Sequence, residues 1–146
     1  MAKSEIQSYR DLDAWKAAME LTLLTYGVTK LLPQEERYGL STQLRRAAVS
    51  IPSNIAEGQS CGLDGRYINH VRIALGSIGE LSTEMEIALR LGFASHSDLA
   101  PAQQQLTRTR QLLFGLLRAL RRSNLLRRGG SALLATFIGL CVATLG

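Results

Sequence analysis

At 146 residues, the chain is long enough for one domain with a hydrophobic core and too short for two. Apolar residues make up 46% of the sequence and aromatic residues 5%, which favours a helical core and argues against a β-sandwich, because strands are rich in aromatic and β-branched residues. The net charge of +5 is uneven: residues 1–100 hold ten Lys or Arg and twelve Asp or Glu (−2), and residues 101–146 hold seven Arg and no acid (+7). A polyanionic partner should therefore meet the C-terminal third, unless these arginines only solvate a helix face.

The first helix is predicted from about Asp11 to Leu32. Asp11 is the expected N-cap, because its carboxylate can accept hydrogen bonds from the amides of the first turn. Apolar residues at helical spacing predict one buried stripe. These residues are Leu12, Trp15, Met19, Leu23 and Tyr26. Pro33 is expected to stop the helix, and residues 34–39 to form a short polar turn.

A second amphipathic helix follows. Its predicted buried face consists of Leu40, Leu44, Ala47, Ala48, Ile51 and Ile55. Arg45 and Arg46 lie off this face and should reach solvent or a partner. Pro52 falls inside the pattern, where it removes an amide donor and crowds the carbonyl four residues earlier, so we expect a kink rather than a clean end. Gly58 and Gly62 are expected to bracket the next loop.

The third helix has the most regular pattern, with Asp64 as its predicted cap and Gly92 at its left-handed C-terminal position. Its apolar positions are Ile68, Val71, Leu75, Ile78, Leu81, Met85 and Ala88 or Leu89. Glycine inside a helix costs about 1 kcal/mol relative to alanine. Gly76 and Gly79 are therefore interpreted as points where a neighbouring helix comes close, the alternative being glycines that are merely tolerated.

A fourth helix is predicted from Ser97 or Asp98, with Pro101 in its first turn, where a missing amide is harmless. Its buried side is marked by Leu106, Leu113, Leu117 and Leu120. Its remaining surface carries Arg108, Arg110, Arg118, Arg121 and Arg122. Four amphipathic segments with short connections predict an all-α, antiparallel up-down four-helix bundle with a C-terminal apolar tail.

These elements divide the chain into an N-terminal arm (1–10), the bundle (11–122), and a basic linker with an apolar tail (123–146). The uncharged run 131–146 is shorter than the roughly twenty apolar residues of a membrane-spanning helix. Three interpretations of it stay open: a weak membrane segment, a strand or helix that packs on the bundle or on an oligomer partner, and a poorly structured tail. The polar start does not resemble a signal peptide, so we expect a cytoplasmic location.

Catalytic, metal and cofactor sites are not predicted. Cys61 and Cys141 are isolated, which argues against a zinc site or a disulfide framework. His70 is interpreted as a partly exposed helix residue rather than a general base. Glu80 and Glu84 share a helix face, but the Glu-x-x-His motifs of a di-metal bundle and a glycine-rich phosphate loop are missing, so a solvated face is favoured.

The polar residues around Pro52 have two interpretations. Asn54 and Glu57 follow the proline, where backbone carbonyls are freed, so either side chain could satisfy a buried group or bind a neighbouring helix. Ser50 and Ser53 could do the same. We favour a structural role over a binding role.

Seven arginines are the candidate nucleic-acid contacts. They are Arg45, Arg46, Arg108, Arg110, Arg118, Arg121 and Arg122. Phosphate contacts of this kind weaken steeply as salt rises, and repetition of the surface in an oligomer would add avidity. Because no aromatic stacking platform is recognised among these arginines, we expect weak sequence specificity and no base recognition of single strands.

Several motifs are shared with one known family. They are the runs Tyr9–Trp15, Ala18-Met19, Tyr38–Leu40, Gln43–Ala48, Ser50–Gly58 and Ile73–Ser77, with Glu80-Leu81 and Glu84. The run Ser-Ile-Pro-Ser-Asn-Ile-Ala-Glu-Gly is the most specific of them. Over about residues 8–120 the sequence resembles the four-helix-bundle proteins encoded in 23S rRNA intervening sequences. It departs from that pattern at residues 59–64, where relatives are often more basic, and after about Arg122.

The resemblance implies a signature role for seven residues, which are Tyr38, Gly39, Ser50, Pro52, Asn54, Glu57 and Gly58. It also implies a barrel-like homopentamer. The family includes the accessory variability proteins of diversity-generating retroelements, which bind a reverse transcriptase and nucleic acid. We therefore expect a non-catalytic oligomeric module without a cofactor that binds RNA or a nucleoprotein partner. The alternative is a structural or scaffolding homo-oligomer, tethered to a membrane by the tail.

Overall fold

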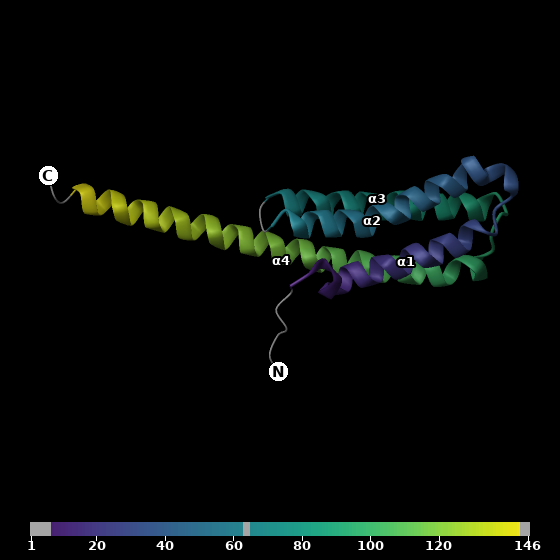
Figure 1. The fold of residues 1–146 in the computed structure, drawn as a ribbon, viewed down its shortest axis with the longest axis horizontal. Coiled ribbons are helices and arrows are strands. Elements are labelled where there is room, and N and C mark those ends of the chain that lie inside the picture. Colours follow the sequence, from purple (N-terminus) through teal and green to yellow (C-terminus); the bar gives the residue numbers. More distant parts are fainter. Residues whose placement is uncertain (1–6, 63–64, 144–146) are drawn as a thin grey trace, which may run out of the picture.

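The computed structural model describes residues 7–62 and 65–143, with side chains described as far as Arg127. Over these ranges all regular secondary structure is helical. In chain order they are η1 (Tyr9–Asp11), α1 (Asp13–Thr29), η2 (Gln34–Tyr38), α2 (Leu40–Ser60), α3 (Gly65–Arg90) and α4 (His96–Ala143). Figure 1 shows α1, α2, α3 and the first part of α4 lying side by side. The predicted antiparallel four-helix bundle is confirmed.

The four helices form a ring in which each contacts two neighbours. Helix α1 packs on α2 and α4, and α3 packs on the same two helices. Over the described residues, helices α2 and α4 do not contact each other, so they lie across the diagonal of the bundle. The core side chains between them include Leu21, Leu44, Ile51, Leu81, Met85 and Leu113. The outer surfaces of α2 and α4 consequently face opposite sides of the molecule.

The predicted buried stripe of α1 is wrong for three of its five residues. Leu12 is buried and Trp15 is half-buried, but Met19, Leu23 and Tyr26 are 36%, 63% and 42% exposed. The helix instead buries Ala14, Ala17, Ala18, Leu21, Thr22, Thr25, Val28 and Thr29. Threonine can be buried here because its hydroxyl donates to a helix carbonyl three or four residues earlier.

The ends of α1 also differ from expectation. Asp11 does not cap α1; its carboxylate accepts from the amides of Gln7 and Ser8 (3.1 and 2.8 Å), and it forms a capping box with Ser8 around η1. Helix α1 then begins at Asp13 and ends at Thr29, before Pro33 is reached. The segment predicted as a polar turn is the short helix η2.

Helix α2 continues through Pro52 without ending, as expected, and its predicted apolar face is buried apart from Leu40, which is partly buried. The carbonyl of Ala48, which Pro52 cannot bond, accepts a hydrogen bond from the Thr22 hydroxyl of α1 at 3.0 Å. Gly58 does not open a loop but lies buried within the last turns of α2.

Helix α3 buries the predicted apolar positions, although Ile68, Leu75 and Leu89 are only partly covered. It ends at Arg90, and Gly92 takes the predicted left-handed C-terminal position: φ is +73°, and the amide of Phe93 donates to the carbonyl of Ala88 at 2.9 Å. The interpretation of Gly76 and Gly79 is wrong, because both are exposed and a Cβ at either position would meet nothing within 4 Å. The predicted cap Asp64 lies outside the described residues.

Helix α4 begins at His96, capped by Ser95, whose amide donates to Asp98 at 2.8 Å. Pro101 therefore lies in the second turn rather than the first. The four predicted leucines are buried, Leu120 being the last of them. The backbone does not break near Arg122 but stays helical to Ala143, and its end projects past the other helices (Figure 1). Within the described ranges, no helix is both long and apolar enough to cross a membrane.

Candidate nucleic-acid interface

The five arginines predicted on α4 all lie on its exposed surface, and we call them the α4 arginine row. They are Arg108, Arg110, Arg118, Arg121 and Arg122. At 3.6 residues per turn, Arg108, Arg118 and Arg122 fall on one stripe of the helix, and Arg110 and Arg121 fall on a second. Up to Arg127, where description of the side chains ends, none of the five forms an ion pair. Their charge is uncompensated on this helix, because no acidic residue follows Asp98 in the sequence.

Arg45 is partly buried and held in place, whereas Arg46 is exposed. The Nε and Nη2 groups of Arg45 donate to the hydroxyl oxygen of Thr29 at 3.0 and 2.9 Å. Its guanidinium lies over the ring of Tyr26, 5.3 Å from the ring centre. Two of the five guanidinium donors are thereby used, which leaves the others for a ligand. The expectation that no aromatic ring accompanies these arginines is therefore wrong at Arg45.

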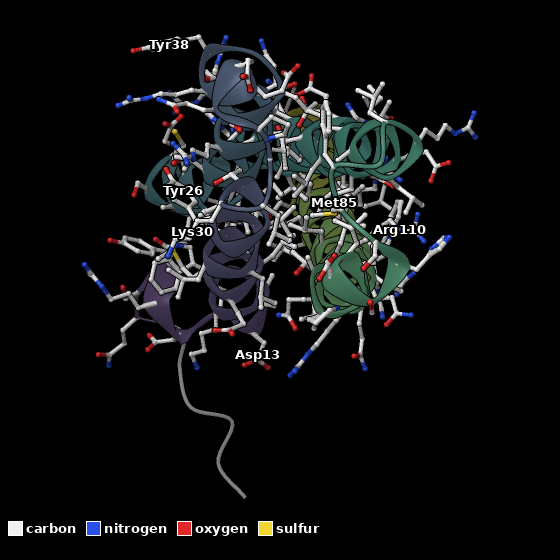
Figure 2. All side chains as sticks on the ribbon, turned by 90° about the vertical axis from the view of Figure 1, so that its right-hand side faces the viewer. Asp13, Tyr26, Lys30, Tyr38, Met85 and Arg110 are labelled. Carbon is white, nitrogen blue, oxygen red and sulfur yellow. The ribbon has the colours of Figure 1, made fainter. Side chains whose placement is uncertain are left out.

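The seven predicted arginines do not form one surface. Arg45 and Arg46 lie on α2, which is diagonally opposite α4. Figure 2, a view rotated by 90°, shows Tyr26, the ring beneath Arg45, on the other side of the molecule from Arg110. Phosphates bound by the α4 arginine row would therefore not contact Arg45 of the same protomer.

A hollow of about 810 Å³ lies beside Arg45 and Arg46. It is lined by Tyr26, Thr42, Gln43, Arg45, Arg46, Ala47, Val49, Ser50, Glu80 and Glu84. Glu80 is exposed, as predicted, but Glu84 is partly buried, and its Oε2 atom has no hydrogen-bond partner among the described residues. Burial and the neighbouring Glu80 carboxylate raise the pKa of Glu84 to about 7. The α3 side of this hollow thus carries less negative charge near neutral pH than its two carboxyl groups suggest.

The polar residues beside Pro52 link α2 to α3. The hydroxyl groups of Ser50 and Ser77 are 2.8 Å apart. The Asn54 amide nitrogen donates to the Ser50 carbonyl at 2.9 Å, and its oxygen lies 3.0 Å from Nδ1 of His70. Glu57 Oε2 is 3.6 Å from the same His70 nitrogen. These are the contacts of a structural role, and the Ser77 and His70 partners on α3 had no signal in the sequence.

The two signature glycines, Gly39 and Gly58, also have local explanations. At Gly58 a Cβ would lie 2.5 Å from Cδ2 of the Tyr67 ring, so the ring packs directly on the α2 backbone. Tyr67 is buried, its hydroxyl has no partner within the described part of the chain, and burial raises its pKa to about 12. A Cβ at Gly39 would lie 2.5 Å from the Glu36 carboxylate, which accepts from the amide of Leu40. Ser53, by contrast, is exposed and does not bridge two helices in the described structure.

No group of three or more His, Cys, Asp or Glu side chains in the described part of the chain could hold a metal ion. His70 is partly exposed, as predicted, with its Nδ1 facing Asn54. Cys61 is a free thiol, and Cys141 lies where side chains are not described.

Comparison with known proteins agrees with this fold. Residues 10–115 match the family described as 23S rRNA-intervening sequence protein. A solved structure from Bacteroides thetaiotaomicron VPI-5482, a protein of unknown function from the S23 ribosomal protein family, is similar with a TM-score of 0.66. The two share 21% sequence identity over 71% of this chain and 97% of that one. No match was found among curated proteins. The chain belongs to the 23S rRNA-intervening sequence protein family.

Proposed function

We propose that the chain is a non-catalytic, homo-oligomeric module that binds RNA or an RNA-containing partner through its arginine-rich helix surfaces. The α4 arginine row carries this proposal. Within the described residues, its five guanidinium groups are exposed and form no ion pair, and the acid of this helix, Asp98, lies in its first turn. Such a surface attracts a polyanion over a Debye length, and its arginines displace the cations that are condensed on the phosphates. By family resemblance, a reverse transcriptase is the protein partner to test first.

Gel-shift titration of the full chain with a structured RNA tests this function. We expect a complex at about 50 mM salt that weakens steeply by about 200 mM. Arg118→Gln with Arg122→Gln should weaken it and lower the slope of log K against log salt by about one for each phosphate that is no longer neutralised. Arg90→Gln is the matched control, because Arg90 is already paired with Glu86 at 2.7 Å. The absence of a complex even at the lower salt concentration would refute RNA binding.

A structural homo-oligomer is the second candidate, favoured by an apolar patch on α1 and α2 that the protomer leaves uncovered. The patch consists of Met19 and Leu23 of α1 and Val49 of α2, which are 36%, 63% and 41% exposed. Burying such side chains against another copy would remove apolar surface from water, at about 25 cal/mol per Å². Sedimentation of the full chain tests this candidate, with a pentamer as the size that the resemblance implies.

The matched variants for sedimentation are Leu23→Glu and Leu91→Glu. Both leucines are exposed, at 63% and 58%, but Leu91 follows α3 and lies outside the patch. We expect Leu23→Glu to lower the oligomer mass and Leu91→Glu to leave it unchanged. A wild-type chain that sediments as a monomer at all concentrations would contradict the oligomer.

A further inference from the structure

Tyr38 presents an aromatic ring almost entirely to solvent. At 86% exposure it is the most exposed large apolar side chain in the described part of the molecule. The backbone that presents it is anchored, because Gly39 bonds the carbonyl of Glu36 at 3.0 Å and Leu40 bonds the Glu36 carboxylate at 2.8 Å. The Arg37 guanidinium lies 5.6 Å from the ring centre. The anchored backbone therefore presents the exposed Tyr38 ring next to the Arg37 guanidinium.

Tyr26 and Arg45 form a second pair of the same kind. The Tyr26 ring is 42% exposed, and Thr29 fixes the guanidinium of Arg45 above it through two hydrogen bonds. Thr29 is itself tied to the carbonyl of Tyr26 at 2.9 Å. Ring and guanidinium are thus arranged before any ligand arrives, which lowers the entropy lost on binding.

The two pairs share one side of the bundle. Thr42 lines the hollow beside Arg45, and its hydroxyl donates to the carbonyl of Arg37 at 2.8 Å, which joins η2 to this surface. Figure 2 shows Tyr38, Tyr26 and Lys30 on the same side of the molecule.

The backbone positions next to the two pairs give the scale of the interval between them. Arg45 lies six positions after Gly39, the N-cap of α2, which is a rise of about 9 Å at 1.5 Å per residue. Stacked bases are about 3.4 Å apart, so the interval matches a few nucleotides. A third pair, Arg10 over Tyr9 at 4.8 Å, does not join this surface, because Tyr9 precedes α1 at the other end of that helix and packs edge-on against Trp15.

We propose that Tyr26, Tyr38, Arg37 and Arg45 form a stacking site for the bases of single-stranded RNA, separate from the α4 arginine row. We call these four residues the tyrosine–arginine face. Unpaired bases stack on aromatic rings and guanidinium planes, and such stacking tolerates any base sequence. Lys30 and Arg46 supply neighbouring positive charge for the phosphates. Because it specifies the form of RNA that is bound, this proposal rests on the proposed function.

Duplex RNA should not use the tyrosine–arginine face, because its bases are already stacked on one another. Its phosphates alone can make the contacts with the α4 arginine row. The same protomer would then bind two RNA forms on opposite sides. The affinity for single strands would depend on both the positive charge and the rings of the tyrosine–arginine face. The affinity for duplexes would depend on charge alone. This difference separates stacking from general electrostatic attraction.

Fluorescence anisotropy with the full chain tests the site, using labelled oligouridylate and an RNA duplex of equal length at about 50 mM salt. The double variant Tyr26→Leu, Tyr38→Leu keeps apolar bulk but removes both rings. We expect it to bind oligouridylate at least tenfold more weakly, since each base–aromatic stack is worth roughly five- to a hundredfold in affinity. Its affinity for the duplex should change by less than about twofold. Tyr26→Phe with Tyr38→Phe should bind both RNAs as wild type does.

Arg118→Gln with Arg122→Gln is the control on the opposite side: it should weaken binding of the duplex and change the affinity for oligouridylate by less than about twofold. If the leucine variant binds oligouridylate as tightly as wild type, or loses both RNAs equally, the stacking site is refuted while the effect of the α4 variant still supports the proposed function. If the wild type binds neither RNA, the proposed function fails and the stacking site fails with it. Circular dichroism melting of each variant confirms that it is folded.

Discussion

Gly58 shows at the scale of one residue why the signature run ends in glycine. A Cβ at this buried position would lie 2.5 Å from Cδ2 and 3.0 Å from Cε2 of the Tyr67 ring. The ring is buried, and Cβ of His70 on the same helix would also lie 3.0 Å away. We expect Gly58→Ala to lower the free energy of unfolding by about 1–3 kcal/mol through overpacking, measured by urea denaturation.

Gly76→Ala is the control for this substitution, because Gly76 is also inside a helix but a Cβ there meets nothing within 4 Å. That variant should be more stable by up to about 1 kcal/mol, since alanine has the higher helix propensity. Equal effects of the two substitutions would show that the contact with Tyr67 does not matter.

The raised pKa of Glu84 predicts how the free energy of unfolding depends on pH. Its pKa is raised from 4.5 to about 7, so between these values the folded state holds a proton that the unfolded state has released. Stability should therefore fall as pH rises from about 4.5 to 7, and the loss should be complete above the folded pKa. Glu84→Gln should remove this contribution and raise the melting temperature at pH 8 more than at pH 5. Glu86→Gln, in an exposed ion pair, should not reproduce that difference.

Helix α1 shows what could be predicted from the sequence at the scale of an element. The helix itself was predictable from its periodicity, but both of its faces carry side chains that could be core. One face has Met19, Leu23 and Tyr26, and the other has Leu21 and Val28 among alanines and threonines. Periodicity favours the face with more large apolar residues, whereas the packed bundle buries the face made mostly of small ones. Only the hydroxyl bonds to helix carbonyls, which have no sequence signature, make the threonine face suitable for burial.

For the candidate site, too, features of a single helix were predictable from the sequence and contacts between helices were not. Exposure of the arginines on α4 was predictable, because they lie off a clear leucine stripe. Their separation from Arg45 was not, since it depends on which helices are diagonal in the bundle. The partners of Arg45 were also hidden, because Thr29 and Tyr26 belong to another helix. Contacts between helices thus set the limit of the sequence prediction.

The link between α1 and α2 at Pro52 gives a prediction for this pair of elements. The proline leaves the Ala48 carbonyl without its helical donor, and the buried Thr22 hydroxyl lies 3.0 Å from it, sharing its single proton between this carbonyl and that of Ala18 at 2.8 Å. Thr22→Val keeps the shape but leaves the carbonyl unsatisfied, which should cost about 1–3 kcal/mol in chemical denaturation. Thr83→Val is the control, because its exposed hydroxyl bonds its own helix at Gly79. A similar small loss in both variants would contradict the role of Thr22.

At the scale of the whole molecule, α4 is much longer than the bundle it belongs to. Its 48 residues span about 70 Å, whereas the 26 residues of α3 span about 40 Å. As far as side chains are described, the last buried one is Leu120. A chain ending at Asn124 should therefore have the same free energy of unfolding as the full chain, within about 0.5 kcal/mol, in matched urea titrations. A chain ending at Leu116 should be clearly less stable, because it lacks the buried Leu117 and Leu120.

The projecting end of α4 also sets a distance for communication. From Arg122 to Ala143 the helix rises about 30 Å, while charges in physiological salt are screened over about 8 Å. A molecule held at the tip would therefore not sense, through its charge, whether RNA occupies the α4 arginine row. Binding at the tip and binding at the α4 arginine row would then be electrostatically independent. Any cooperativity between the two binding events would have to be transmitted as a conformational change of the helix.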